Sequence, residues 1–133
     1  MMEKLRDEAA RILSACPTGV LGAVGDGSPQ ALPVRFVAHG LTVDCLLPRW
    51  HDLAYWLEAG AEAVLLVIGP EGSQRWLSLR GHAAPGPAAD WAALLPGVRN
   101  AGDLYLAVRL TPARVELVDE GRAWGARETL DLI

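Results

Sequence analysis

The connections between apolar segments are the feature that most constrains how this chain can fold. Most apolar runs after residue 18 are separated by only a few residues, and these breaks are rich in Gly, Pro, Asp and Ser, as in GDGSP (25–29) and PEGS (70–73). A parallel crossover needs a dozen or more residues, whereas a hairpin needs about two to five. The short connections therefore favour antiparallel strands that pair with their sequence neighbours and argue against a fold of βαβ units.

Apolar periodicity divides the chain into about seven strands and three short helices. Strands are expected at 19–24, 30–38, 41–47, 63–68, 75–84, 104–110 and 114–118. Helices are expected at 3–15, 50–60 and 90–95. We find no clear period after residue 118. Several short strands at hairpin spacing are typical of a small barrel, and because no linker divides the chain we expect a single domain over residues 1–133.

The apolar content is high for a chain of this size. Hydrophobic residues make up 51% of the 133 positions, although a domain this small buries only about two-thirds of its surface. The surplus suggests a further buried face, such as a subunit interface or a ligand cleft. No apolar run reaches the roughly 20 residues of a membrane span, so we expect no membrane association.

Charge and cysteine usage exclude several classes of protein. Twelve basic and sixteen acidic side chains give a net charge of −4, which disfavours nucleic acid as a partner. Eleven of the twelve basic residues are Arg, so any anion-binding side chain is expected to be Arg. Cys16 and Cys45 lack metal-ligand spacing, and we expect both to be core residues with no metal site. The charged, amphipathic start argues against a signal peptide, and we expect a cytoplasmic protein.

The segment 75–84 contains the densest set of polar side chains. Alternation along a strand places Leu77 and Leu79 on one face, which is expected to be core. The other face presents an indole, a hydroxyl, a guanidinium and an imidazole, from Trp76, Ser78, Arg80 and His82. This row could form the wall of a site for a flat polar ligand, or it could be the solvated face of an antiparallel sheet.

A second candidate site lies at the start of the helix predicted at 50–60. Arg49, Trp50, His51 and Asp52 stand at or before its first turn, where free N–H groups and the helix dipole favour an anion. The strand segment 33–36, PVRF, adds a second arginine. The alternative is that Arg49 is a surface residue paired with a carboxylate.

Familiar catalytic motifs are missing from the sequence. It contains no GxGxxG, P-loop, HExxH or GxSxG pattern, and His39, His51 and His82 are scattered. The sequence therefore leaves any catalytic residue unidentified. If the protein is an enzyme, a cofactor is expected to supply its chemistry.

Four segments, in this order and spacing, resemble the pyridoxamine 5′-phosphate oxidase-like, FMN-binding split barrels. They are PQALPVRFVAHGLTVDCLL (29–47), PRWHDLAYWLEAGAEAVLLVI (48–68), WLSLRGHAAP (76–85) and TPARVELVD (111–119). The resemblance implies a mainly β fold, a split barrel of about six to seven antiparallel strands with short helices. It also implies a homodimer with two flavin sites at the subunit interface, which would account for the surplus apolar content.

The resemblance also suggests where the flavin would bind. Arg49 matches a position where the family often has Lys and, with Arg35, is expected to hold the phosphate. The backbone of Pro33–Val37 matches the segment along the isoalloxazine ring, and Trp76 and Ser78 match cofactor-facing positions of the fifth strand. The expected cofactor-binding residues are Pro33, Val34, Arg35, Phe36, Arg49, Trp50, His51, Trp76, Ser78 and Arg80.

The leading hypothesis is therefore a homodimeric FMN-binding protein, an oxidoreductase of unknown substrate. One alternative is a reductase of the same fold that uses the deazaflavin F420, whose acidic tail would need a basic groove from Arg75, Arg80 and Arg99. Another is a dimeric binding module without a cofactor. This second alternative is favoured by the apolar run Leu46, Leu47 and Pro48, where the family often has Ser or Thr.

Overall fold

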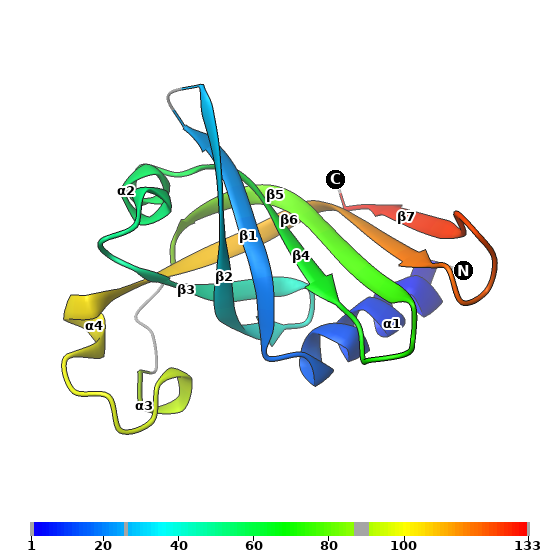
Figure 1. The fold of residues 1–133 in the computed structure, drawn as a ribbon, viewed down its shortest axis with the longest axis horizontal. Helices are drawn as coiled ribbons and strands as arrows, with labels where there is room; N and C mark the ends of the chain where they lie inside the picture. Colours follow the sequence, from blue (N-terminus) through cyan, green and yellow to red (C-terminus); the bar gives the residue numbers. More distant parts are fainter. Residues whose placement is uncertain (1, 26, 87–90, 133) are drawn as a thin grey trace.

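A computed structural model describes residues 2–25, 27–86 and 91–132 of the chain. Within these residues, seven strands form one antiparallel sheet in the order β3-β2-β1-β4-β5-β6-β7, and pairing of β3 with β6 closes the first six into a barrel (Figure 1). The strands are β1 (Thr18–Gly25), β2 (Ser28–His39), β3 (Thr42–Pro48), β4 (Ala61–Ile68), β5 (Arg75–Pro85), β6 (Tyr105–Asp119) and β7 (Arg127–Asp131). The predicted split barrel is thus confirmed.

The helices lie at two ends of the barrel. Figure 1 shows α1 (Met2–Ala15) at one end, near the chain termini and β7, where it packs against β2, β6 and β7. At the other end lie α2 (Asp52–Glu58), α3 (Trp91–Leu94) and α4 (Ala101–Leu104). Among the residues described, no helix is long and apolar enough to cross a membrane.

Strand alternation places the core inside the barrel. Leu21, Leu65 and Leu79 point inward from β1, β4 and β5 and are almost completely buried. Leu13 of α1 and Leu57 of α2 join the same cluster from the two ends. Because each such side chain contributes about 1.5–3 kcal/mol when buried, this inner cluster is the main source of stability.

The last third of the chain differs from the prediction. The segments 104–110 and 114–118, expected to be separate strands, form the single strand β6. Pro112 does not break it, because it lies opposite Gly81 where the β5–β6 register shifts, so the missing N–H falls at an irregularity of the ladder. A Cβ at Gly81 would collide with the carbonyl oxygen of Thr111, so only glycine allows this close approach.

The structure contains two elements that the sequence did not predict, α4 and β7. Helix α4 follows α3, which is a shorter form of the helix predicted at 90–95; residue 90 lies outside the described residues. Strand β7 pairs with β6 in the part of the tail where we found no period. It packs Leu130 into the core while its neighbours stay exposed.

The seam between β3 and β6 closes the barrel and contains an ion pair. Asp44 and Arg109 are register partners, and the guanidinium donates from Nε to Oδ1 (2.8 Å) and from Nη2 to Oδ2 (3.0 Å). His39 Nε2 lies 3.1 Å from the same Oδ2. The hydrogen bonds from Arg109 hold the pKa of Asp44 below its usual value, even though partial burial opposes this. Next to this pair, burial raises the pKa of the Cys45 thiol to about 12.

Candidate functional site

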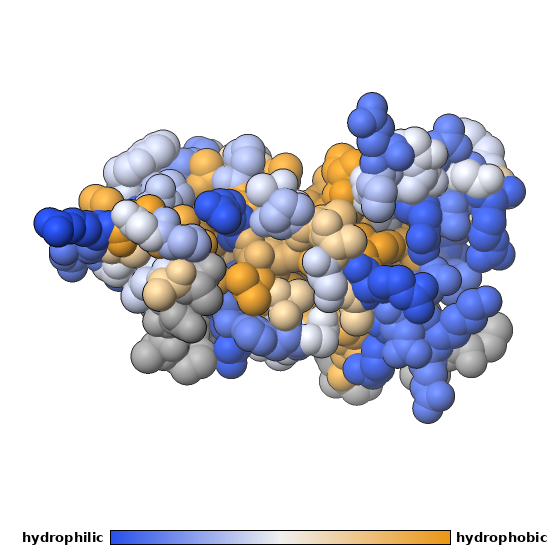
Figure 2. Space-filling view, turned by 90° about the horizontal axis from the view of Figure 1, so that it is seen from below, coloured by the Kyte–Doolittle hydropathy of each residue, from blue (hydrophilic) through white to orange (hydrophobic). Residues whose placement is uncertain are grey.

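The outer face of the strands β2, β1, β4 and β5 is apolar along its centre. Val20, Val24 and Ile68 point outward and are exposed, although the inner face of the same strands already forms the core. The view from below looks along this face and not onto it. In that view, apolar residues gather in the middle of the molecule and the end that carries α1 is hydrophilic (Figure 2). A sheet that is apolar on both faces is normally covered on both.

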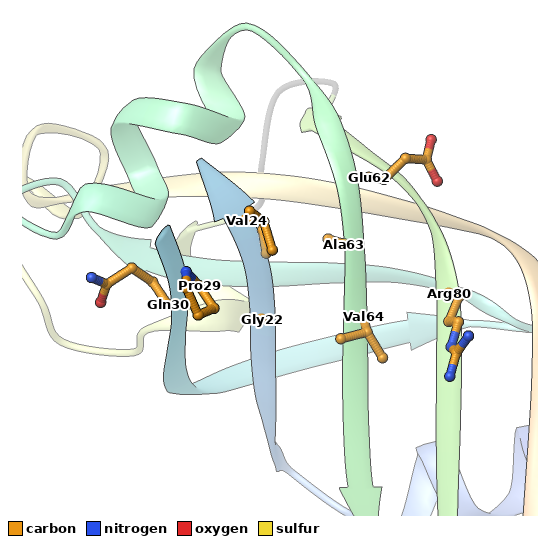
Figure 3. A pocket seen from close by; sticks show the side chains of 9 residues that line it. Gly22, Val24, Pro29, Gln30, Glu62, Ala63, Val64 and Arg80 are labelled. Carbon is orange, nitrogen blue, oxygen red and sulfur yellow. The ribbon is translucent and has the colours of Figure 1, made fainter. Parts of the chain in front are cut away.

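A shallow groove of about 600 Å³ lies on this outer face, and we call it the sheet groove (Figure 3). Gln30 lies at its β2 side, and Glu62 and Arg80 lie at its β4–β5 side. Between them the floor is apolar. The lining residues are Gly22, Ala23, Val24, Pro29, Gln30, Glu62, Ala63, Val64 and Arg80.

A second groove, of about 300 Å³, lies between β2, the end of β3 and the start of β6, and we call it the aromatic groove. Trp50 and Tyr105 contribute its aromatic side chains, and Arg35 is the charged side chain among the described lining residues. An apolar surface with two aromatic groups and one cation fits a flat aromatic ligand that carries an anion. The lining consists of residues 32–35, Leu46, Pro48, Trp50, Leu95 and Tyr105.

One side of the aromatic groove is built from the segment between β5 and β6. Leu95 and Ala101 pack with Leu46 of β3 in a small cluster separate from the barrel core. Gly102 leaves room for the indole of Trp91, since a Cβ there would lie 3.2 Å from its Nε1. Tyr105, which follows α4 directly, packs against the same cluster. The position of this groove side therefore depends on a few contacts outside the core.

The structure brings four of the expected site residues together. Pro33, Val34, Arg35 and Trp50 all line the aromatic groove. Val34, at the edge of this groove, and Phe36, outside it, are both buried in the barrel core. Within the described part of the chain, the guanidinium of Arg35 has no carboxylate within ion-pairing distance, so its charge is free to meet a ligand.

Arg49 and His51 have other contacts in the structure. Arg49 donates from Nε to the carbonyl of Gly102 (3.1 Å), and its Nη1 lies 3.4 Å from Oε1 of Glu58. His51 is the N-cap of α2, where its Nδ1 accepts a hydrogen bond from the N–H of Leu53 (3.1 Å). The alternative that Arg49 pairs with a carboxylate thus describes the observed contact, and the imidazole of His51 caps the N-terminus of α2.

The expected residues of β5 lie apart from the aromatic groove. Trp76, Ser78 and Arg80 share the outer face of β5, as alternation predicted, and β1 and β4 separate β5 from β2 in the sheet. Arg80 lines the sheet groove, and with Ser78 it also lines a small cleft beside Arg114. The expected set therefore divides between two regions of one chain.

The arginines proposed for an F420 tail do not form one groove. Arg75 faces α1, where its Nη2 lies 2.6 Å from Oε2 of Glu8, and its Nε lies 3.6 Å from Oδ2 of Asp119. Arg80 lies on the outer face of the same strand. The guanidinium of Arg75 is thus occupied by acidic partners on the inner side.

The expected site residues did not include five that line the aromatic groove, namely Leu32, Leu46, Pro48, Leu95 and Tyr105. Tyr105 and Leu95 are the two that come from distant parts of the chain. Tyr105 stands at the start of a predicted strand and Leu95 at the end of a predicted helix. Neither position carries a local signal for ligand binding. Both reach the groove only because the segment between β5 and β6 folds back against Leu46.

No protein-family model matches the chain, and no curated protein matches it significantly. Solved structures do match it. General stress protein 26 from Bacillus anthracis str. Sterne has a TM-score of 0.70 at 17% identity, over 96% of this chain and 98% of that one. A Clostridium acetobutylicum protein related to general stress protein 26, of the pyridoxinephosphate oxidase family, has a TM-score of 0.75 at 15% identity, over 98% and 96%.

A third structure, the FAD binding protein from Mycobacterium smegmatis, has a TM-score of 0.63 at 16% identity, over 92% of this chain and 95% of that one. All three similarities extend over nearly the whole of both chains. At these identities the similarities show that the backbone folds alike, and they give no information about side-chain chemistry. The chain therefore has the split-barrel fold of general stress protein 26 and the pyridoxinephosphate oxidase family.

Proposed function

We propose that the protein binds FMN in the aromatic groove and acts as a flavin-dependent oxidoreductase. The observation that carries the proposal is the meeting of residues 33–35, Trp50 and Tyr105 in one groove. Support also comes from the fold, which the FAD binding protein of Mycobacterium smegmatis shares. A planar ring with a phosphate tail matches a groove that offers aromatic surface and a cation with no carboxylate partner among the described residues.

Each part of the groove has a role in this proposal. The backbone of residues 33–35, Trp50 and Tyr105 would hold the ring, and the guanidinium of Arg35 would hold the phosphate with paired hydrogen bonds. The apolar lining from Leu46 and Leu95 keeps water from the ring. Bound FMN supplies electron transfer, and the protein orients it and shields it from solvent.

Completion of the site requires a second copy of the chain. A groove of about 300 Å³ is at the lower limit of small-molecule sites, so a flavin would extend beyond it. The apolar outer face around the sheet groove offers a surface for a homodimer. Trp76, Ser78 and Arg80 lie too far around the barrel to serve the groove of their own chain. In a dimer they would serve the flavin of the second copy.

Titration of the purified protein with FMN tests the cofactor. We expect quenching of flavin fluorescence on binding, and we expect Arg35→Ala to weaken affinity about tenfold to a hundredfold through loss of a charge-assisted bond. Arg11→Ala, an exposed arginine of α1, is the matched control. Affinity for FMN that is equal in both variants would exclude Arg35 as the phosphate ligand, and no quenching in the unaltered protein would exclude the FMN site itself.

Light scattering after gel filtration tests the dimer. Val64 points outward in the sheet groove, so Val64→Glu places a charge in the proposed interface and should give a monomer. Val98→Glu alters an exposed valine outside this face and should leave the mass unchanged. A protein that is a monomer before any substitution would contradict the proposed assembly.

A cofactor-free dimeric binding module is the second candidate function. Leu46 and Leu47 are both buried at the end of β3, so this segment offers the groove no hydroxyl group. Melting curves with FMN, F420 and no addition distinguish the candidates. The module predicts no shift in Tm with either cofactor, while the FMN proposal predicts a clear increase with FMN and a weaker one with F420.

A further inference from the structure

Arg49 connects the end of β3 to the segment that precedes β6. Its backbone N–H donates to the carbonyl of Leu104 (2.9 Å), and its Nε donates to the carbonyl of Gly102 (3.1 Å). Its Nη1 lies 3.4 Å from the carboxylate of Glu58 in α2. One residue therefore holds α4 through two carbonyl groups and α2 through a carboxylate. Figure 1 shows α2 and α4 at the same end of the barrel.

The side chain of Arg49 does not belong to the aromatic groove. The described residues that line the groove include both sequence neighbours, Pro48 and Trp50, but not Arg49 itself. An anion that approached Arg49 would also meet the carboxylate of Glu58, which repels it. Arg35 differs on both points, because it lines the groove and has no carboxylate partner among the described residues.

Among the described residues, the segment that Arg49 holds has few other supports. Its buried residues Leu95 and Ala101 pack with Leu46, and Trp91 and Leu94 are only partly buried against them. A cluster this small orders a chain segment weakly. The same segment places Leu95 in the groove and leads directly into Tyr105. Loss of the Arg49 contacts would therefore loosen one side of the aromatic groove.

We propose that Arg49 is a positioning residue: it fixes residues 91–104 as a wall of the aromatic groove, while Arg35 recognises the anionic group of the ligand. This inference rests on the proposed flavin site. It separates two arginines that the sequence analysis expected to hold the same phosphate. Arg49 acts on every ligand of the groove, whereas Arg35 acts only on ligands that carry the anion.

FMN and riboflavin separate these roles, because they share the ring and the ribityl chain and differ by the phosphate. Arg49→Ala should weaken both ligands by the same factor, roughly threefold to tenfold, as expected for the loss of one or two neutral-strength hydrogen bonds. Arg35→Ala should weaken FMN and leave riboflavin nearly unchanged. Arg122→Ala, which removes another arginine paired with a carboxylate, is the control and should change neither.

Arg49→Lys provides the sharpest comparison. Lysine keeps the positive charge and can still bind a phosphate, but its single ammonium lacks the planar fork that serves Gly102 and Glu58 together. We expect this variant to resemble Arg49→Ala with both flavins. Recovery of FMN affinity in Arg49→Lys, or a loss in Arg49→Ala confined to FMN, would overturn the inference and make Arg49 a phosphate ligand.

Hydrogen exchange without any ligand gives an independent measurement. The amides of residues 91–104 should exchange faster in Arg49→Ala, and less so in the milder Glu58→Gln, while the amides of β4 and β5 stay unchanged. If the unaltered protein bound neither flavin, the proposed function would fail. Faster exchange in Arg49→Ala would still show that Arg49 fixes residues 91–104. Unchanged exchange in Arg49→Ala would refute the positioning role of Arg49, whether or not flavin binds.

Discussion

The two ends of the seam between β3 and β6 are held in different ways. At one end the ion pair of Asp44 and Arg109 joins two strands that are already in register. At the other end the strand pairing stops at Pro48 and Tyr105, and Arg49 holds the preceding helix α4 through two of its carbonyl groups. The first arrangement secures the closure of the barrel, and the second leaves space for a groove. The comparison teaches that a closed barrel can carry a binding groove where its closing seam passes into a loop.

The largest expected effect is on the chemical reactivity of the buried Cys45 thiol, which lies next to the Asp44–Arg109 ion pair in the seam. Cys45 lies opposite Val108, and its pKa of about 12 lowers the thiolate fraction at neutral pH about a thousandfold relative to an ordinary thiol. We expect a thiol reagent to label Cys45 only when the seam opens. Mass spectrometry of the Cys16→Ser variant, which keeps Cys45 alone, follows this labelling. Equal rates with and without urea would mean that the seam is open in the native protein.

Substitution of two adjacent leucines of β3 tests whether packing on the barrel side of the seam contributes more stability than packing on the groove side. Leu47 is fully buried in the barrel core, so Leu47→Ala should lower the free energy of unfolding by about 2–5 kcal/mol. Leu46 packs in the small outer cluster, which can relax, and Leu46→Ala should cost less, about 1–2 kcal/mol. Urea unfolding measures both. Equal losses would show that the outer cluster is as firmly packed as the core.

The ion pair of the seam predicts a pH dependence. Arg109 lowers the pKa of Asp44 in the folded state, so the stabilisation is fully present above the unfolded pKa of about 3.9 and is lost as the pH falls through the lower folded value. Asp44→Asn should cost about 1 kcal/mol at pH 7, because the pair is partly exposed, and the difference should shrink below about pH 4.

Thermal unfolding at a series of pH values checks this prediction. Asp131→Asn, which removes the carboxylate of an exposed pair with Arg114, is the matched control and should cause little change at any pH. A constant difference between Asp44→Asn and the unaltered protein from pH 7 to below pH 3 would contradict the role of the Asp44 carboxylate.

The sequence predicts the parts of the fold that local patterns encode. Alternation along 75–84 correctly separates the buried Leu77 and Leu79 from the outward Trp76, and short connections correctly predict antiparallel pairing. The continuity of β6 could not be predicted. Pro112 ends a strand by every local rule, and only its partner Gly81 on another strand makes it tolerable.

In the candidate site, too, the sequence predicts which residues take part but not the contacts between residues that are far apart in the chain. Residues 33–35 and Trp50 were predicted from a resemblance in order and spacing, and they meet in one groove. The partners of Arg49 were not predicted in detail, since Gly102 lies 53 positions away in the sequence. Contacts of this kind depend on how the barrel closes, which no local pattern records.

The pairing of β3 with β6 also decides when this protein can fold during its synthesis. Asp44 and Arg109 are 65 positions apart, and contacts between such distant residues form slowly because a long loop must close first. Strands β1 to β5 leave the ribosome before β6 and cannot form the barrel without it. Their inner apolar faces stay uncovered until β6 has emerged from the ribosome. The unfinished chain is therefore the form of this protein most exposed to aggregation.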